Sequence, residues 1–522
     1  MAEYVFGANI LENLTTGMYK DSRVIYREYI QNACDQIDVA YNTGLFANKN
    51  EGKIHIDIDS EKRKITIEDN ATGIARDKFR ETLANIADSD KRIGEAKGFR
   101  GIGRLCGLAY CKKLIFKSKH QGEDTISIMT CDAQKMRDLI SQSTHGNKHT
   151  ASEILNQIYE FASVPTKNIE DHWFCVELID VNPENHALLD SSYVKSYLAF
   201  VAPVPYKNTF CFRSEVYKHA GQLNQTIDEY WIGVNEEQVF KEYKTHFKTS
   251  KGEDEIFDIE TKDFYDEHNS LIAWMWFGVS QFKAIIEKDC PMRGIRLRKG
   301  NIQIGDEDAL QKLFREDRGN HYFIGEIFAV SKDLIPNSQR DYFNENPTRL
   351  EFEFAIRTYF HDVLHRLYYE ASTINNNYSK IDTLNHKVTE HQQKIQNGAY
   401  VDDNQRIQAE QVINKARQDA TKAQKDLERK RANPNNSLVG KIITRIDNKR
   451  VNNETSTDQA TYNCPQEEQA QEPAKPNYRT DKLSQYSKRE RKLISRIFTI
   501  ILSATDEQSA EKIISKIEEE LQ

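Results

Sequence analysis

Three short stretches near the N-terminus constrain this chain of 522 residues more than any other feature. They span residues 28–35 (EYIQNACD), 69–74 (DNATGI) and 98–104 (GFRGIGR), in that order. Each stretch alone is common in proteins. Together, a polar helix face, a carboxylate at a strand end and a glycine-rich loop can surround a single phosphate-bearing ligand.

The first stretch belongs to a segment without proline or glycine, residues 22–40, whose apolar residues recur at helical intervals. Glu28, Asn32 and Asp35 are spaced so that they share one face of the predicted helix. The amide oxygen of Asn32 can coordinate Mg²⁺, which otherwise keeps water and phosphate ligands. Glu28 can accept a proton from an attacking water. A solvated polar face is the alternative interpretation.

The second stretch follows two alternating runs, residues 53–59 and 63–68, which predict a β-hairpin. Asp69 therefore comes just after a strand, where a buried carboxylate can accept a hydrogen bond from an exocyclic amine such as that of adenine. Gly73 lets the backbone approach a flat base closely, because it has no side chain. An ordinary Asp-Asn turn is the alternative.

The third stretch is rich in glycine and precedes an apolar, helix-like run at residues 105–110. Backbone N–H groups that open onto a helix N-terminus can hold phosphate oxygens. Residues 88–97 are small and charged, as expected of a lid over a bound nucleotide. The stretch is neither a Walker A loop nor a dinucleotide-binding fingerprint.

In combination the three stretches resemble the GHKL ATPases, which include gyrase B subunits, the ninety-kilodalton heat-shock chaperones, histidine kinases, MutL and the MORC proteins. The resemblance covers roughly residues 5–205. It implies an α+β chain that begins with a Bergerat-type α/β sandwich, a mixed and mainly antiparallel sheet with helices on one face. It also implies that ATP and Mg²⁺ bind there.

The resemblance assigns Glu28 as general base, Asn32 as magnesium ligand and Asp69 as adenine anchor. The residues expected to line the nucleotide site are Asn32, Asp35, Asp69, Gly73, Lys97, Gly98, Phe99, Arg100, Gly101, Ile102 and Gly103. The sequence departs from the family in two places. Ala71 stands where a glycine is usual, and residues 172–178 lack the threonine expected near adenine.

The segment after residue 205 is similar to the heat-shock and MORC branch. Residues 291–306 predict two strands around a Lys-Gly-Asn turn, and residues 322–330 predict another strand. The following phrase, LIPNSQRD, is similar to the heat-shock loop whose arginine reaches the γ-phosphate, which makes Arg340 the candidate for that role. A surface arginine paired with Asp341 is the alternative, and Arg298 and Lys299 compete for the role.

The second half is expected to be helical. Apolar residues seven apart between residues 360 and 395 predict a coiled-coil segment, and a second helix is expected over residues 402–431. The two can form a helical hairpin or pair across a dimer, or the first can be one long helix on the middle domain. The predicted domains are the ATP-binding domain 1–205, the α/β middle or transducer domain 206–350, the helical segment 351–432, a disordered linker 433–486 and a helical dimerisation or docking element 487–522.

Composition excludes several other classes of protein. The net charge is −8, which leaves no global nucleic-acid footprint. The eight cysteines contain no Cys-x-x-Cys pair and are expected to be reduced thiols. No signal peptide or 18-residue apolar run is recognisable. The sequence therefore predicts a cytoplasmic protein without a membrane partner.

Three functions remain open at this stage. The first is a homodimeric, ATP-hydrolysing clamp that resembles the heat-shock chaperones and acts on a protein client. The second is a MORC-like clamp on DNA in genome or antiviral defence, supported by the basic residues 294–301 and the basic tail helix. The third is a scaffold that binds nucleotide without hydrolysing it.

Overall fold

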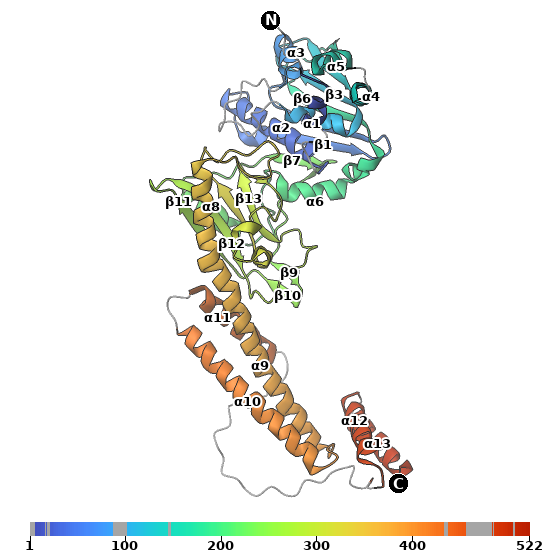
Figure 1. Cartoon of the computed structure of the whole chain (residues 1–522), viewed down its shortest axis with the longest axis vertical. Helices are drawn as coiled ribbons and strands as arrows, with labels where there is room; N and C mark the ends of the chain where they lie inside the picture. Colours follow the sequence, from blue (N-terminus) through green and yellow to red (C-terminus); the bar gives the residue numbers. More distant parts are fainter. Residues whose placement is uncertain are drawn as a thin grey trace. The chain divides into compact units, whose positions relative to one another are not determined.

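The computed structural model of this chain describes residues 6–15, 17, 21–86, 102–144, 148–432, 437–455, 483, 485–504 and 507–521. It divides into two compact units. The first unit comprises residues 1–280 and 284–365, and the second comprises residues 281–283 and 366–522 (Figure 1). The secondary structure is α+β, as the sequence predicts.

The N-terminal part of the first unit is built on an eight-stranded sheet with the order β5-β4-β3-β6-β2-β1-β7-β8. All neighbours are antiparallel except β1 and β7, so the sheet is mixed and mainly antiparallel. Its strands are β1 (Lys53–Asp59), β2 (Lys64–Asp69), β3 (Cys111–Lys119), β4 (Thr125–Asp132), β5 (Tyr159–Pro165), β6 (Trp173–Val181), β7 (Trp231–Val234) and β8 (Glu237–Gln238). The last two strands lie beyond the predicted domain boundary at residue 205.

Helices and short 3₁₀ segments pack around this sheet (Figure 1). They are α1 (Asn9–Leu14), α2 (Val24–Asn42), η1 (Lys49–Glu51), α3 (Arg76–Ala84), η2 (Gly103–Ala109), α4 (Ala133–Thr144), α5 (Ala151–Ile158), η3 (Pro183–Leu189) and α6 (Ser191–Val201). The next helix, α7 (Arg213–Gln222), carries His219, which contacts Asp263 and Trp274 of the second sheet described below. The helix α2 contacts β1, β2 and η2. Its apolar residues Ile30, Ala33 and Ile37 are buried, because the 3.6-residue period directs them to one side.

The C-terminal part of the first unit holds a second sheet with the order β11-β12-β15-β13-β14. These strands are β11 (Asp258–Tyr265), β12 (Leu271–Val279), β13 (Gly294–Lys299), β14 (Ile302–Ile304) and β15 (Ile324–Ala329), and β9 (His246–Thr249) pairs separately with β10 (Gly252–Glu255). The predicted Lys-Gly-Asn turn joins β13 to β14, which confirms the hairpin. Short segments η4 (Gln311–Leu313) and η5 (Asp317–Tyr322) precede β15, and α8 (Pro347–Tyr359) with the π-turn η6 (Phe360–Leu364) follows it.

A fully buried carboxylate lies in the middle of this second sheet. Glu326 on β15 has no exposed surface, and neither have its partners Arg298 and Lys241. Lys241 Nζ lies 3.1 Å and Tyr243 Oη 3.0 Å from its oxygens, while Tyr206 Oη and Arg298 Nε also donate to it. Burial alone would raise the pKa of Glu326, but the charges of Arg298 and Lys241 lower it to about 2.

The same cluster ties the two sheets of the first unit together. Arg298 Nη2 donates to the carbonyl of Phe200 in α6 at 2.8 Å, and Asn301 Nδ2 donates to the carbonyl of Asp228 at 2.6 Å. Lys241 lies just after β8 of the first sheet. The relative position of the two sheets is therefore fixed by buried hydrogen bonds as well as by apolar packing.

The second unit is helical and comprises α9 (His365–Gln396), which begins at the boundary, α10 (Asp403–Arg431), α11 (Ser437–Thr455), α12 (Lys488–Ala504) and α13 (Glu507–Glu520). The helices α9 and α10 lie side by side as a helical hairpin (Figure 1), and Asn377 Nδ2 donates to Asp426 Oδ2 at 3.0 Å between them. The turn uses Gly398 at φ +59°, and the side chain of Asp402 caps α10 by accepting from the backbone N–H of Gln405.

The segment from residue 433 to 486, predicted as a linker, differs in its first part. The helix α11 occupies residues 437–455 of it, with Val439, Ile442 and Ile443 buried. Tyr378 Oη of α9 donates to Asp447 Oδ1 of α11 at 2.6 Å. The linker was predicted from the polar composition of the whole segment. A short run of apolar residues at helical spacing changes that composition little and was therefore overlooked. Residues 456–482 of the predicted linker lie outside the described residues.

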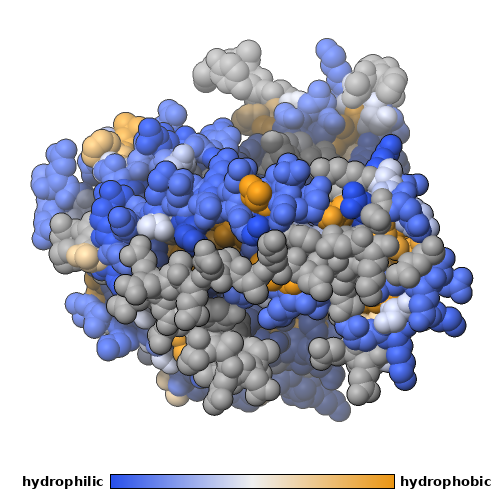
Figure 2. Space-filling model, turned by 90° about the horizontal axis from the view of Figure 1, so that it is seen from below, coloured by the Kyte–Doolittle hydropathy of each residue, from blue (hydrophilic) through white to orange (hydrophobic). Residues whose placement is uncertain are grey.

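The described surface is mainly hydrophilic on the face shown in Figure 2, with small separate hydrophobic patches. In the described ranges, no helix is both long and apolar enough to cross a membrane. Five buried cysteines are free thiols, and burial raises the pKa of Cys111 to about 12.

We expect Glu326→Gln to lower the free energy of unfolding by ~3–5 kcal/mol, because two buried cations lose their counter-charge. The loss should be largest above the ordinary glutamate pKa of 4.5 and should vanish as the pH falls to about 2, where Glu326 itself is protonated. Urea denaturation at several pH values measures both effects.

The exposed Glu215 of α7 gives a matched control, Glu215→Gln, which should change stability by no more than about 0.5 kcal/mol. A Glu326→Gln protein as stable as the natural one at pH 7 would show that the cluster does not hold the two sheets together.

Candidate ATP-binding site

The helix α2 presents the predicted polar residues in an apolar setting. Glu28 and Asp35 are each 5 % exposed, and Asn32, between them, is half-buried. Their apolar neighbours on the helix pack into the core, so the polar face points away from it. The structure thus places all three on one helix, as predicted, and excludes a fully solvated face for the two carboxylates.

The carboxylate of Glu28 lies between two arginines. Arg340 Nε is 3.1 Å and Arg27 Nη2 is 3.5 Å from Glu28 Oε1. All three side chains are nearly covered, with 12, 10 and 6 % of Arg340, Arg27 and Glu28 exposed. Arg27 also donates to the carbonyl of Gln339 at 3.3 Å. The predicted phosphate sensor and the predicted base therefore touch, although they are far apart in the sequence.

The alternative candidates for the sensor are engaged elsewhere. Arg298 is buried against Glu326, and Lys299 Nζ donates to the carbonyls of Val330 and Ser331. The predicted pairing of Arg340 with Asp341 is not among the described ion pairs. Arg340 itself has φ +55°, a conformation that costs a non-glycine residue energy and holds its side chain toward α2.

The end of the glycine-rich stretch reaches the same carboxylate. A Cβ on Gly103 would lie 2.5 Å from Glu28 Oε2, so any side chain at the start of η2 would displace the Glu28 carboxylate. Tyr29 Oη holds η2 in place, because it donates to the carbonyl of Arg104 at 3.0 Å and accepts from Gly107 N at 3.1 Å. Sequence reasoning did not select Tyr29.

Asp69 ends strand β2 and is 4 % exposed. Its Oδ1 accepts a hydrogen bond from the backbone N–H of Ala71 at 3.0 Å. Burial raises the pKa of Asp69 to about 7, and the one backbone hydrogen bond does not offset it. Burial destabilises the ionised form of this carboxylate. A ligand that donates a hydrogen bond to it would therefore stabilise the ionised form.

The loop after Asp69 is held by groups that sequence reasoning missed. Ser118 Oγ accepts from Ile74 N at 2.6 Å, His120 Nδ1 lies 2.9 Å from the carbonyl of Thr72, and His172 Nδ1 lies 2.8 Å from that of Ala71. Pairing β3 with β6 brings these side chains to one sheet end. A helix-to-loop contact comes from Thr72 Oγ1, which donates to Gln36 Oε1 at 2.9 Å.

Gly73 is required by geometry. Its φ is +62°, and a Cβ there would lie 2.0 Å from the carbonyl oxygen of Lys119. The close approach is to the backbone of the neighbouring strand, so packing within the protein requires glycine here, and its role beneath adenine stays a prediction. Ala71, which replaces the usual glycine of the family, is fully buried and tolerated, because it does not appear among the residues at positive φ.

Of the predicted site residues, the structure places Glu28, Asn32, Asp35, Asp69, Gly73, Ile102, Gly103 and Arg340. Glu28, Gly103 and Arg340 are in direct proximity, and Asp69 and Gly73 share one loop at the other end of α2. Lys97, Gly98, Phe99, Arg100 and Gly101, and the predicted lid at 88–97, lie outside the described residues.

The residues present fit an adenine nucleotide with Mg²⁺. Gly103 keeps the space beside the Glu28 carboxylate free of a side chain, and the buried Asp69 carboxylate has accepting capacity beyond its single backbone hydrogen bond. In the described part of the chain no three His, Cys, Asp or Glu residues cluster as metal ligands. A magnesium ion here would therefore depend on Asn32, phosphate oxygens and water.

Comparison with known proteins gives the class of this domain. Residues 26–162 match the family model described as histidine kinase-, DNA gyrase B- and HSP90-like ATPase. The segment that carries Glu28, Asn32, Asp69, Gly73 and Gly103 is thus an ATPase domain of the GHKL class, as the sequence resemblance predicts.

Among curated proteins, the chain is similar to HtpG chaperones at low identity. It is 28 % identical over 145 residues to the chaperone protein HtpG of Azorhizobium caulinodans, an alignment covering 24 % of this chain and 23 % of the relative. The HtpG of Nitrobacter hamburgensis is 34 % identical over 97 residues, which is 17 % of this chain and 15 % of the relative. The HtpG of Shigella flexneri is 22 % identical over 281 residues, an alignment that covers 51 % of this chain and 40 % of the relative.

The match to these relatives is partial. Even the longest of the three alignments spans 40 % of the relative, while the other two span less than a quarter.

We predict that nucleotide affinity depends on pH through Asp69. Adenine donates to the ionised carboxylate, so binding must deprotonate a group whose pKa is about 7 in the free protein. Affinity for a non-hydrolysable ATP analogue with Mg²⁺ should change little above pH 8 and fall by up to about tenfold per pH unit below 7. Calorimetry between pH 6 and 9 measures this dependence.

The control is Asp69→Asn, which should bind weakly with no pH step at 7. Because the raised pKa makes ionised Asp69 costly in the free protein, this variant should also be more stable than the natural protein at pH 8 and lose that advantage toward pH 5. An affinity for the analogue that is flat with pH in the natural protein would contradict the role of Asp69.

Proposed function

We propose that this chain is an ATP-hydrolysing clamp of the HtpG type. Its two N-terminal domains associate in a homodimer when ATP binds and a lid closes, and the cycle acts on a protein client. The observation that carries the proposal is the contact between Arg340 and Glu28, 3.1 Å apart. It supports a coupling between the middle segment and the base of the ATPase domain.

Each residue has a distinct part in the proposed reaction. Asp69 and Gly73 bind and orient the adenine, and Asn32 holds the magnesium ion. Glu28 accepts a proton from the attacking water. ATP with Mg²⁺ supplies the activated phosphoryl group. Arg340, already charged and nearly buried beside this site, contributes a positive charge where negative charge develops.

Nucleotide binding can also break the ion pair between Arg340 and Glu28. While Arg340 lies against Glu28 Oε1, it neutralises the carboxylate and occupies the side from which a proton would be taken. A γ-phosphate competes for the same guanidinium, since arginine binds phosphate bidentately. Release of Glu28 would then coincide with engagement of the middle segment. Slow turnover, set by this rearrangement, is expected.

A client surface is supported by α8. Leu350 and Phe354 are one helical turn apart and are 65 and 73 % exposed. Such a pair on an otherwise hydrophilic surface suits an apolar segment of a partner protein.

The sequence argument for DNA is weakened by the structure. The basic hairpin at residues 294–301 is not a surface feature, because Arg296 and Arg298 are 5 and 0 % exposed. Lys299 is half-buried and donates to two backbone carbonyls. Cations that are covered in this way are not available to the phosphate backbone of DNA. A protein client is therefore the better-supported partner.

The first test of this proposal is the rate of phosphate release. Glu28→Ala should lower it by about 10²–10⁴-fold while analogue binding is retained, because general-base catalysis is lost. Arg340→Ala should lower it by about 10²-fold, and Arg340→Lys should recover only part of that, since lysine cannot form a bidentate contact. If the Glu28→Ala variant and the natural protein release phosphate at the same rate, the proposed hydrolysis by Glu28 is refuted. The scaffold that binds nucleotide without hydrolysing it would then be the remaining function.

The second test is suppression of aggregation of a chemically unfolded model protein. Leu350→Glu combined with Phe354→Glu should abolish suppression without changing ATP turnover. Val164→Glu, an exposed apolar position on β5, is the matched control and should have no effect. Unchanged suppression, together with DNA binding that falls steeply with salt, would favour the clamp on DNA.

A further inference from the structure

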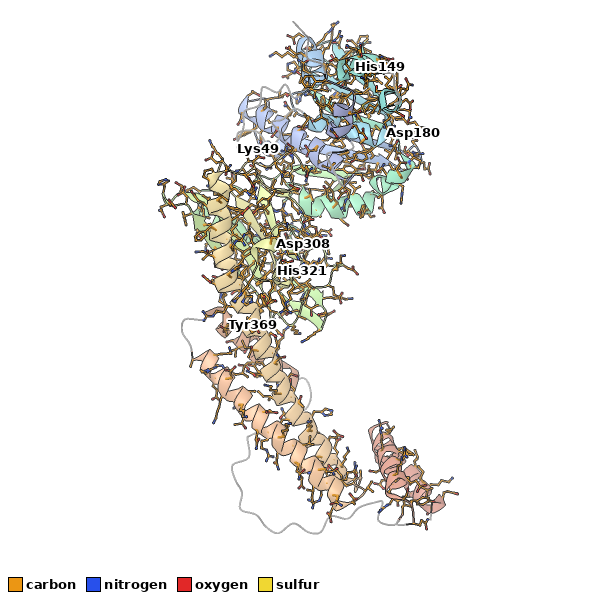
Figure 3. The ribbon with its side chains drawn as sticks, in the orientation of Figure 1. Lys49, His149, Asp180, Asp308, His321 and Tyr369 are labelled. Atoms are coloured by element: carbon orange, nitrogen blue, oxygen red, sulfur yellow. The ribbon has the colours of Figure 1, made fainter. Side chains whose placement is uncertain are left out.

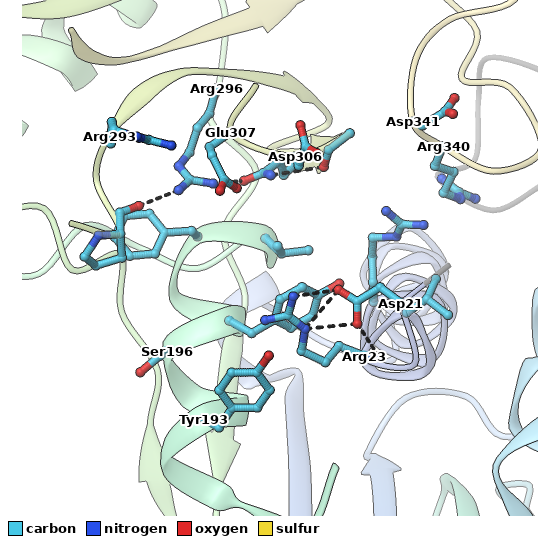
Figure 4. Close-up of a pocket in the computed structure, with 18 of the residues that line it drawn as sticks. Asp21, Arg23, Tyr193, Ser196, Arg293, Arg296, Asp306, Glu307, Arg340 and Asp341 are labelled. Atoms are coloured by element: carbon cyan, nitrogen blue, oxygen red, sulfur yellow. Dashed lines mark hydrogen bonds and ion pairs between the residues drawn. The ribbon is translucent and has the colours of Figure 1, made fainter. Parts of the chain in front are cut away.

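A second cavity lies beside the candidate ATP-binding site. It has a volume of about 450 Å³ and is enclosed by the start of α2, by α6 and by the loops around β13 and β14 (Figure 4). Its lining carries charged side chains of both signs, with Arg293 and Arg296 on one side. A cavity of this size accommodates a small organic molecule.

Two arginines in this cavity are buried and form no direct ion pair with a described residue, although the charge of Glu307 acts on Arg296. Arg293 and Arg296 are 9 and 5 % exposed, and neither makes an ion pair with any described residue. Arg296 donates through Nη1 to Gln303 at 2.7 Å and through Nη2 to the carbonyl of Pro291, but its Nε has no partner. The Arg293 guanidinium makes no described hydrogen bond. Buried cations in proteins are usually paired directly, so these two guanidinium groups have donor capacity for an anionic ligand.

Three other arginines of the lining already contact carboxylates. Arg23 binds Asp21 through both carboxylate oxygens, at 3.0 and 2.6 Å, and stacks on Tyr193 and Tyr197. Arg27 and Arg340 share Glu28 outside the lining, as described above. The excess positive charge is therefore concentrated at Arg293 and Arg296, which Figure 4 shows together on one side of the cavity.

Two glycines build this side of the cavity. Gly294, at φ +92°, would place a Cβ 2.6 Å from the carbonyl of Glu307, and Gly305, at φ +69°, one 2.6 Å from that of Asp341. Asn320 Nδ2 donates to the same Glu307 carbonyl at 2.8 Å, and His321 lies 3.1 Å from Asp308 (Figure 3). The loop that carries the lining is thus fixed in place, and the cavity is preformed.

The lining also defines what can bind. The adjoining wall is apolar and aromatic, with Tyr197, Phe200 and Val201, and the Phe200 ring lies against the Arg296 guanidinium at 4.7 Å. The carboxylates of Asp306, Glu307 and Asp341 repel additional negative charge. A ligand with one compact anionic group and an apolar or aromatic body matches this distribution. A chain of several phosphates does not.

We propose that this cavity is a second ligand site, separate from the ATP-binding site, which binds a phosphomonoester with a small aromatic or apolar body. The phosphate lies between Arg293 and Arg296, because two guanidinium groups can share one tetrahedral dianion by bidentate hydrogen bonds. The body packs against Phe200 and the tyrosines of α6.

The cavity also touches the catalytic arrangement. Arg27 and Arg340 line it and contact Glu28 on their other side. An occupant should therefore change ATP turnover, and this consequence alone rests on the proposed function. Binding does not depend on hydrolysis and is measured separately.

The test uses phenyl phosphate as probe and the full chain saturated with a non-hydrolysable ATP analogue, so that the ATP-binding site is filled. Calorimetry should show binding of one equivalent, at least tenfold tighter than inorganic phosphate or benzoate. Arg293→Gln should weaken it at least tenfold, and Arg293→Lys less. Arg315→Gln, an exposed arginine of the same unit that does not line the cavity, should bind as the natural protein does.

Two results would overturn the proposal: no binding of phenyl phosphate by the natural chain, or equal binding by the Arg293→Gln variant. Equal affinity for phenyl phosphate and inorganic phosphate would also refute it, since the aromatic wall would then contribute nothing. Circular dichroism and analogue affinity identify a variant that fails to fold. If phenyl phosphate binds but ATP turnover is absent or unchanged, the binding site stands and the link to hydrolysis fails.

Discussion

The arrangement of the first unit depends on one buried carboxylate. Glu326 sits in the middle of the second sheet without exposed surface, and its charge is balanced by Arg298 and Lys241. Those partners come from the β13–β14 hairpin and from the segment that leaves the first sheet, so one cluster fixes both. Removing these charges from water costs free energy, and ion pairs and hydrogen bonds offset that cost only where each charged group has a well-placed partner. The specificity of the geometry follows from that requirement.

Because the two sheets are held in this way, the loop after β15 lies against α2. Arg340 then reaches Glu28 across more than three hundred residues of sequence. The same packing creates the cavity with Arg293 and Arg296, so Arg340 lines one space and contacts the base of another. Two sites that share a wall of arginines have a direct physical route by which an occupant of one can affect the other.

Much of the fold was predictable from local patterns. The β1–β2 hairpin, the β13–β14 hairpin, α2 and α10 follow from apolar spacing and turn residues. The helix α11 was missed because its stripe is short and surrounded by polar residues. The pairing of β7 with β1 was missed because strand partners distant in sequence leave no local signal. Likewise the loop supports Ser118, His120 and His172 become apparent only when β3 pairs with β6.

The order and spacing of a glutamate, an asparagine, an aspartate and several glycines were enough to indicate the ATPase class that residues 26–162 match, because each motif is local in the sequence. Which charges come into contact follows only from the folding of the chain. Arg298 and Arg340 are equally basic in the sequence, yet one is buried against Glu326 and the other faces Glu28. Burial and distance, which set the energy of a charge, are properties of the folded chain and not of its composition.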